Sequence, residues 1–180
     1  MQAYYTTYGL PVLIARCCNQ FGAHQYPEKL IPRMIACALA HQRLPVYGDG
    51  MQVREWMAVE DGCQALLALL ERGIPGEVYN VGSGCERTNI WMVERIVDHL
   101  HQMLDAEIDR SLITHVQDRR GHDRRYAMDT AKLAALHWWP RVQEENFGSA
   151  LQEVVQWYAT HPETLLTSSV RGSDATEDGA

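Results

Sequence analysis

Two segments carry arginines whose chemistry suits an anion. Arg54 follows Tyr47–Gly50, where two glycines flank an aspartate and predict a tight turn joining strands 44–47 and 52–57 in a hairpin. The segment 118–126 holds four arginines, two aspartates and one histidine, in a chain of net charge −7. A guanidinium offers paired donors to a phosphate or carboxylate and stays protonated. Each segment therefore predicts either an anion clamp or solvated surface ion pairs, with Arg54 pairing to Glu55 or Asp49 in the second case.

Five polar or aromatic residues fall at the ends of predicted strands or in the loops that follow them. They are Asn19, Arg54, Asn80, Arg119 and Tyr126. Open α/β sheets bind ligands at the edge where such residues gather. The aromatics Tyr47, Trp56, Tyr79 and Tyr126 could stack on a nucleobase or could be core and rim residues. Together these residues predict a site for a phosphorylated small molecule.

Other chemistry is weakly represented. The histidines have no metal-ligand spacing, and Cys17 and Cys18 close an apolar run, which predicts packed thiols rather than nucleophiles. The sequence from Gly82 to Gly84 lacks the third glycine of a dinucleotide fingerprint. We therefore expect no metal site and no complete cofactor loop here.

Composition bounds the class of protein. The chain has 180 residues, of which 46% are hydrophobic and 22% charged, as in soluble globular domains. A net charge of −7 argues against a nucleic acid or an anionic membrane as partner. Five cysteines without a paired-cysteine motif favour a reducing compartment, and no stretch resembles a leader or a membrane span. We expect a cytoplasmic protein.

The apolar pattern predicts an α/β chain. Leu10–Cys17 is nearly continuously apolar, which is typical of a strand buried on both faces of a parallel sheet. The other expected elements are a helix ending at Tyr8–Gly9, helices 27–40, 62–72, 90–104 (capped by Thr88 or Asn89), 129–137 and 146–157, and strands 77–82 and 113–117.

Several strings resemble one family. They are TYGLPV at 7–12, RC at 16–17 with Asn19, YPEKLIP at 26–32, PVYGDG at 45–50, VR at 53–54 with Trp56, VED at 59–61, GEVYN at 76–80, and DR at 118–119 with GHDRRYA at 121–127. Residues 4 to about 160 thereby resemble the C-terminal half of dTDP-glucose 4,6-dehydratases, which are extended short-chain dehydrogenases/reductases of the NAD-dependent epimerase/dehydratase group. The PEKLIP and GHDRRYA strings are specific to the dehydratases.

The resemblance implies roles for matched residues. Asn19 would contact the sugar diphosphate, and the residues Glu28, Lys29, Leu30 and Pro32 would line the nucleotide pocket. Pro45 and Tyr47 would bracket the thymine, Arg54 and Arg119 would clamp the diphosphate, and Asn80 and Tyr126 would complete the pocket. Cys17 and Asn19 would pass near the nicotinamide end of NAD. The chain departs from the family pattern at Gln20, Ala58, Gly62 and Arg120.

The resemblance also implies what this chain does not hold. The glycine fingerprint for NAD, the catalytic Thr-Asp-Glu group and the Tyr-x-x-x-Lys pair have no counterpart in it. We therefore expect a substrate-binding half of a lyase that is inactive alone and does not bind NAD alone, with a separate NAD-binding half as a possible partner. The alternatives are a catalytically dead nucleotide-sugar-binding or interaction module, and a fragment of an epimerase or GDP-mannose dehydratase.

The expected organisation follows from this resemblance. Residues 1–26 would be the last strand and loop of a truncated NAD-binding domain, a remnant of a Rossmann-type parallel sheet. Residues 27–163 would form a small α/β nucleotide-sugar-binding region, and residues 164–180 a disordered tail. The strand 10–17 would then lack its sheet neighbours.

Overall fold

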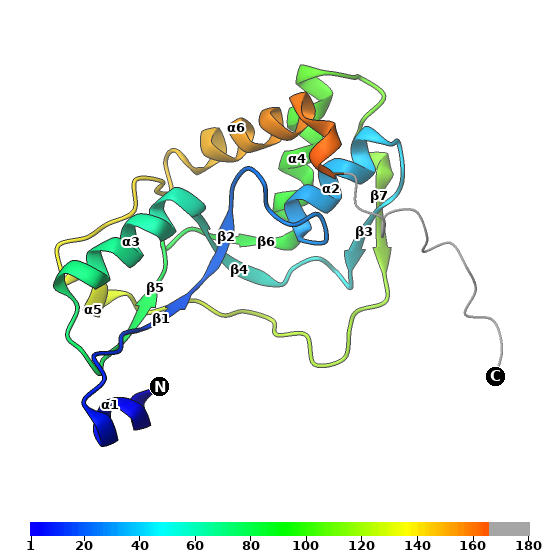
Figure 1. Ribbon diagram of the computed structural model, residues 1–180. Coiled ribbons are helices and arrows are strands. Elements are labelled where there is room, and N and C mark those ends of the chain that lie inside the picture. The colour runs from blue at the N-terminus through cyan, green and yellow to red at the C-terminus, as the bar shows by residue number, and fades with distance from the viewer. Residues whose placement is uncertain (166–180) are drawn as a thin grey trace.

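The computed structural model describes residues 1–165 and confirms an α/β fold with parallel strand pairs (Figure 1). Three small sheets cross the molecule. They are β1 (Ile14–Cys17) with β5 (Val78–Val81), β2 (Asn19–Phe21) with β4 (Val53–Ala58) and β6 (Glu86–Thr88), and β3 (Leu44–Tyr47) with β7 (Ile113–Val116). The helices are α1 (Gln2–Tyr8), α2 (Leu30–Leu39), α3 (Val59–Arg72), α4 (Asn89–Met103), α5 (Ala131–Ala134) and α6 (Phe147–Thr160), with short 3-10 turns at Arg110–Leu112 and Pro162–Leu165.

The predicted hairpin is wrong, although the turn in it is real. Gly48 and Gly50 have φ of 57° and 71°, and the Gly50 amide donates to the Tyr47 carbonyl at 3.1 Å. However, β3 pairs in parallel with β7, whereas β4 pairs in parallel with β2 and antiparallel with β6. The turn therefore connects strands of two different sheets, because β3 and β4 each pair with strands that are distant in the sequence.

The apolar run from Leu10 is only partly a strand. It is extended from Ile14 to Cys17 and pairs in parallel with β5, so one sheet neighbour that we expected outside the chain lies within it. Burial on both faces is also wrong, because Arg16 and Cys17 are exposed. Only the β5 side of β1 is paired among the described residues.

The main core lies where α2, α4 and α6 pack together. The helix α4 contributes the apolar stripe Met92, Val93, Ile96, Val97 and Leu100, all buried. The predicted cap is confirmed, because the Thr88 hydroxyl accepts a hydrogen bond from the Trp91 amide at 3.2 Å. A smaller core of Met57, Leu69, Tyr79, Val81 and Leu133 joins α3 and α5 to the β1–β5 pair.

Several predicted boundaries shift for identifiable reasons. The second helix begins at Leu30 rather than Pro27, and the third begins at Val59 rather than Gly62. The earlier start brings Asp61 into the first turn, where its buried carboxylate accepts from the Arg141 and Val142 amides at 3.0 and 2.9 Å. The expected loop after Gly82 contains the strand β6, which was not predicted because it forms only by antiparallel pairing with β4.

The ends of the chain differ from expectation in opposite ways. Helix α1 ends as predicted at Gly9, whose φ is 66°, but none of its residues is buried. At the other end, Thr164 and Leu165 belong to a 3-10 turn and Leu165 is buried, so the predicted tail begins too early at 164. Residues 166–180 of that predicted tail lie outside the described part of the chain. Within residues 1–165, no helix has the length and apolarity to cross a bilayer.

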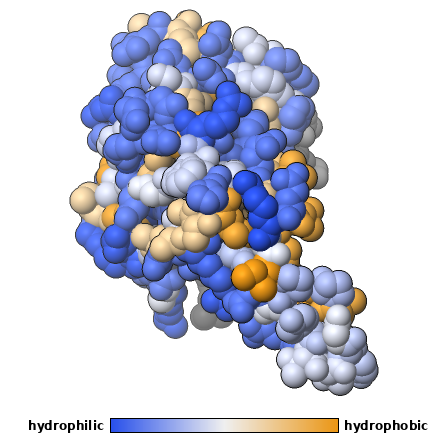
Figure 2. Space-filling view, turned by 90° about the vertical axis from the view of Figure 1, so that its left-hand side faces the viewer, coloured by the Kyte–Doolittle hydropathy of each residue, from blue (hydrophilic) through white to orange (hydrophobic). Residues whose placement is uncertain are grey.

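Large apolar side chains are exposed at the end that carries α1. They are Tyr4, Tyr5, Tyr8 and Leu10, together with Leu66, Leu67, Leu70 and Ile74 on and after α3. Figure 2 shows this segment projecting from the body, with apolar residues gathered beside its base. The described residues therefore leave apolar surface exposed at this end of the molecule, mainly on α1 and α3.

Candidate functional site

A cavity of about 270 Å³ opens between helix α2, strands β3 and β4, and the loop after β7. Its walls combine cationic, aromatic and apolar side chains. They are Asn19, Glu28, Leu30, Arg33, Met34, Pro45, Val46, Tyr47, Arg54, Trp56, Asn89, Val93, Arg119, His122 and Tyr126. Residues distant in the sequence thus meet at one site of a size suited to a small molecule.

Strand β4 aims alternate residues to opposite sides, as strand geometry requires. Arg54 and Trp56 line the cavity, whereas Glu55 lies between them in sequence and accepts hydrogen bonds from the Gly84 and Met128 amides at 2.7 and 2.9 Å. Glu55 is buried and fully committed to the backbone. The surface pairing of Arg54 with Glu55 is therefore wrong.

Arg54 is buried, with 5% of its surface exposed, which overturns its interpretation as a solvated surface arginine. Its Nη1 donates to the Val53 carbonyl at 2.7 Å, and its guanidinium carbon lies 4.6 Å from the centre of the Tyr126 ring. Its Nη2 is buried and has no hydrogen-bond partner. An unpaired buried donor costs about 1–3 kcal/mol or more when charged, so this group is poised for an acceptor that enters the cavity.

Two of the four arginines in the segment 118–126 hold the loop rather than bind a ligand. Arg124 makes two contacts to the Asp49 carboxylate at 2.8 and 2.9 Å, and Arg125 makes two to Glu86 at 2.6 and 2.7 Å. The bonds from Arg125 lower the pKa of the Glu86 carboxyl. The pKa of Asp49 is also lowered, first by the Met51 amide and then by Arg124. The pairing of Asp49 with Arg54 is therefore wrong as well.

A second set of contacts fixes the base of the same loop. The Asp118 carboxylate accepts from the Gln52 amide at 2.9 Å and lies 2.7 Å from His122 Nδ1. The bond to His122 is the main cause of the lowered pKa of Asp118. This contact orients the His122 ring at the cavity wall, 6.4 Å from Tyr47 and perpendicular to it. Sequence reasoning missed His122, although the GHDRRYA string contains it.

The structure brings most of the predicted binding residues to the cavity. Those that line it are Asn19, Glu28, Leu30, Pro45, Tyr47, Arg54, Arg119 and Tyr126. Asn19 Oδ1 accepts from the Tyr126 hydroxyl at 3.2 Å, which ties the two sides of the site together. Their contacts with a nucleotide sugar remain predictions, because placement in a wall does not demonstrate binding.

Four predicted residues do not line the cavity. Lys29 is exposed before α2, Pro32 is buried within it, and Asn80 donates from β5 to the Asp129 carbonyl at 3.0 Å. Cys17 ends β1 and is exposed, so its interpretation as a packed thiol is wrong. Cys18 is buried as expected, and burial raises the pKa of its thiol to about 12, with a further contribution from Glu55.

Arg33 and Met34 were missed, although a helical signal points to them. They lie three and four residues after Leu30, so they share its face of α2 and line the cavity with it. The expected helix contained all three residues, but its cavity-facing side became visible only when β3 and β4 were placed beside it. Helical spacing relative to a predicted site residue would have found them.

The residues beside β5 do not fit a dinucleotide loop. A dinucleotide pyrophosphate is held where a glycine-rich turn leads into a helix. Gly82–Gly84 leads instead into strand β6, and a side chain at Gly82 would collide with the Glu55 carboxylate. Here glycine makes room for Glu55, and no cofactor-binding step is assigned to this loop.

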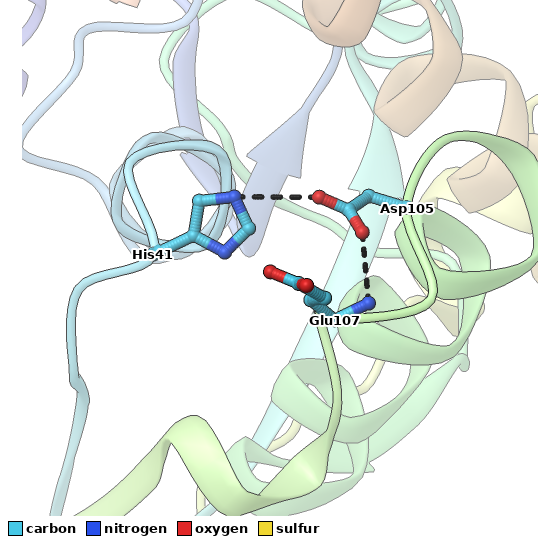
Figure 3. A group of neighbouring side chains, drawn as sticks. All are labelled: His41, Asp105 and Glu107. Carbon is cyan, nitrogen blue, oxygen red and sulfur yellow. Dashed lines mark hydrogen bonds and ion pairs between the residues drawn. The ribbon is translucent and has the colours of Figure 1, made fainter.

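One group of metal-ligand side chains lies away from the cavity. His41 follows α2, and Asp105 and Glu107 follow α4 (Figure 3). His41 Nε2 lies 3.3 Å from Asp105, whose other oxygen accepts from the Glu107 amide at 2.8 Å. Both Asp105 oxygens are thus used within the group, and His41 and Glu107 are exposed. The contact between His41 and Asp105 connects the loop after α2 to the loop after α4, which accounts for this group.

Comparisons with known proteins identify the family of this chain. A family model described as GDP-mannose 4,6 dehydratase matches residues 1–149. A dTDP-glucose 4,6-dehydratase of Xanthomonas campestris is 46% identical over 177 residues, which is 96% of this chain and 49% of the relative. The chain thus spans about half the length of the curated relatives it matches.

Solved structures of the same enzyme share the fold. A dTDP-glucose 4,6-dehydratase of Streptomyces venezuelae, determined with NAD bound, has a TM-score of 0.82 and 40% identity, covering 90% of this chain and 48% of that one. The Bacillus anthracis enzyme, also in complex with NAD, has a TM-score of 0.79 and 45% identity over 90% of this chain and 49% of its own. The predicted resemblance is confirmed: the chain belongs to the GDP-mannose 4,6-dehydratase family, among relatives that are dTDP-glucose 4,6-dehydratases.

Proposed function

We propose that this chain is the nucleotide-sugar-binding half of a dTDP-glucose 4,6-dehydratase and that it binds a dTDP-sugar in the cavity beside β4. The observation that carries the proposal is the buried Arg54 guanidinium, whose Nη2 has no acceptor and lies in a wall shared with Arg119. A diphosphate supplies the charge and the oxygens that such a group lacks. The names of the relatives supply the nucleotide and the sugar.

The two sides of the cavity suit the two parts of such a ligand. Pro45, Tyr47 and His122 offer flat and apolar surfaces to the thymine. Arg54, Arg119 and Asn19 offer donors to the diphosphate. Arg119 is exposed, so its contribution is reduced by solvent and should depend on ionic strength.

The proposal limits this chain to binding and positioning. Conversion of dTDP-glucose to the 4-keto-6-deoxy sugar requires oxidation at C4, loss of water across C5 and C6, and return of the hydride to C6. NAD carries the hydride when it is bound, and a tyrosine–lysine pair acts on the proton. Neither that pair nor a fitting dinucleotide loop occurs in the chain. We therefore expect the isolated chain to be inactive and not to hold NAD alone.

We further propose that an NAD-binding half docks where α1 and β1 lie. The outer edge of β1 is unpaired among the described residues, and exposed apolar residues lie on α1 and α3 at the same end of the molecule. A parallel strand added there would extend the β1–β5 sheet and cover that surface. The unpaired cysteines fit a reducing compartment, and a cytoplasmic location remains a prediction on that ground.

Calorimetry on the purified chain tests the proposal. We expect dTDP and dTDP-glucose to bind, GDP to compete poorly, and no 4-keto product to form with added NAD. Turnover by the isolated chain would overturn its assignment as an inactive half. Binding without activity even after adding the NAD-binding half of a relative would favour a binding module. Preference for GDP would favour a GDP-mannose dehydratase, and preference for UDP an epimerase.

A further inference from the structure

Trp56 lines the cavity and is as deeply buried as Arg54. It follows Arg54 by two residues on β4, so both side chains lie on the same face of the strand. Its partner in register on β2 is Asn19, which also lines the cavity. Only 4% of its surface is exposed. Trp56 therefore lies beside Arg54 and Asn19, the two residues expected to contact the diphosphate.

The indole of Trp56 has an unused donor. Its Nε1 is buried and has no hydrogen-bond partner in the structure, as is also true of Arg54 Nη2. Buried tryptophan N–H groups ordinarily have an acceptor, and the exceptions call for an explanation. Arg54 and Trp56, two residues apart on one strand, thus each leave a buried donor unpaired in the wall of one cavity, which points to a single missing ligand with several acceptors.

The backbone leaves Trp56 little freedom to satisfy this donor elsewhere. Its amide donates to the Cys85 carbonyl at 2.9 Å, and its carbonyl accepts from the Ser83 hydroxyl at 2.5 Å. The residue is thereby held on both sides in the middle of the three-stranded sheet. The indole N–H can therefore be paired only by an acceptor that enters the cavity.

We propose that the Trp56 indole N–H donates a hydrogen bond to an oxygen of the β-phosphate or the hexose of the bound sugar nucleotide, which makes Trp56 a specificity-determining residue. The inference rests on the proposed function, because the acceptor belongs to that ligand. Residues two apart on a strand are separated by about 6.6 Å, so Arg54 and Trp56 engage different oxygens of one extended ligand. The exposed Tyr126 ring lies over Arg54, so it must shift to admit an acceptor to that guanidinium.

Indole N–H signals in nitrogen-15 NMR spectra provide a direct test. The chain has five tryptophans and so gives five such signals, of which Trp56→Phe removes one and thereby assigns it. We expect dTDP-glucose to move the Trp56 proton downfield more than the other four, and dTMP, which lacks the β-phosphate and the hexose, to leave it nearly unchanged. dTDP, which lacks only the hexose, tells whether the acceptor belongs to the diphosphate or to the sugar.

Affinity provides the second measurement. Phenylalanine keeps an aromatic ring but lacks the N–H, so we expect Trp56→Phe to weaken dTDP-glucose binding roughly tenfold, as for one bond to a charged acceptor. Trp139→Phe is the control, because Trp139 is exposed and outside the cavity, and it should change affinity less than twofold. If Trp56→Phe does not fold, sequential assignment of the wild-type spectrum replaces it.

The outcomes separate the two proposals. Failure of the wild-type chain to bind dTDP-glucose sinks the proposed function. Binding of dTDP-glucose by the wild type with an unmoved Trp56 signal overturns the role of Trp56 and leaves the proposed function intact. A shift caused equally by dTMP would place the acceptor on the nucleoside monophosphate, which also contradicts this inference.

Discussion

The two ends of this molecule bury their apolar residues to very different degrees. Around α2, α4 and α6, large side chains such as Ile96, Leu100 and Phe147 are fully buried. Around α1 and the outer side of α3, side chains such as Tyr8 and Leu70 are 74% exposed. The first region has a complete core of its own, whereas the second presents apolar surface of the kind that proteins usually cover. The cavity lined by Arg54 and Trp56 belongs to the first region.

The largest expected difference between the two ends is in stability. Ile96→Ala should lower the free energy of unfolding by about 2–5 kcal/mol, because it leaves a cavity in the main core. Chemical denaturation measures the change. A loss below 1 kcal/mol would show that the α4 core is not tightly packed and would remove the contrast.

Arg54→Ala should produce the next largest effect, on ligand binding. Truncating a buried charged donor costs about 2–5 kcal/mol, so affinity for dTDP-glucose should fall at least thirtyfold by calorimetry. Arg54→Lys is the matched control, because it keeps the charge and loses the paired donors. Unchanged affinity in Arg54→Ala would remove Arg54 from the site.

Acid should loosen the 118–126 loop before it affects the core. Because Arg125 lowers the folded-state pKa of Glu86, their pairing stabilises the loop above the ordinary glutamate pKa of about 4.3 and is lost as the pH falls through the folded value. NMR titration of the Glu86 carboxyl should show the lowered pKa. In Arg125→Ala it should return toward the ordinary value, and an unshifted pKa in the wild type would contradict the pairing.

Leu70→Gln should have the smallest effect on stability, within about 0.5 kcal/mol, because the side chain is already exposed. The same change should reduce self-association measured by sedimentation, since it removes apolar surface from the incomplete end. Leu69→Gln, at the adjacent buried position, is the contrasting variant and should destabilise the chain strongly. If Leu70→Gln and Leu69→Gln destabilised the chain equally, the Leu70 side chain would have to be buried in solution.

Many residues of the candidate site could be predicted from short sequence motifs. The PEKLIP and PVYGDG strings contain Glu28, Leu30, Pro45 and Tyr47, which all line the same cavity. Asn80 does not line the cavity, since a strand-end position does not say which of several sheets the strand joins. The ion pairs of Arg124 with Asp49 and of Arg125 with Glu86 could not be predicted either, because the partners lie 75 and 39 residues apart in the sequence.

The amino-acid pattern alone was enough to predict the family and the α/β class, and also the tight turn at Gly48 and Gly50, the Thr88 cap and the apolar stripe of α4. Each of these depends on neighbours within a few residues, where propensity and hydrogen bonding act directly. By contrast, the folded arrangement was needed to see that β3 pairs with β7 instead of β4, that Arg54 is buried, and that Trp56 keeps an unpaired donor on the same strand face. Those features depend on which distant strand satisfies a backbone edge and which side chains exclude water, and local composition does not encode either choice.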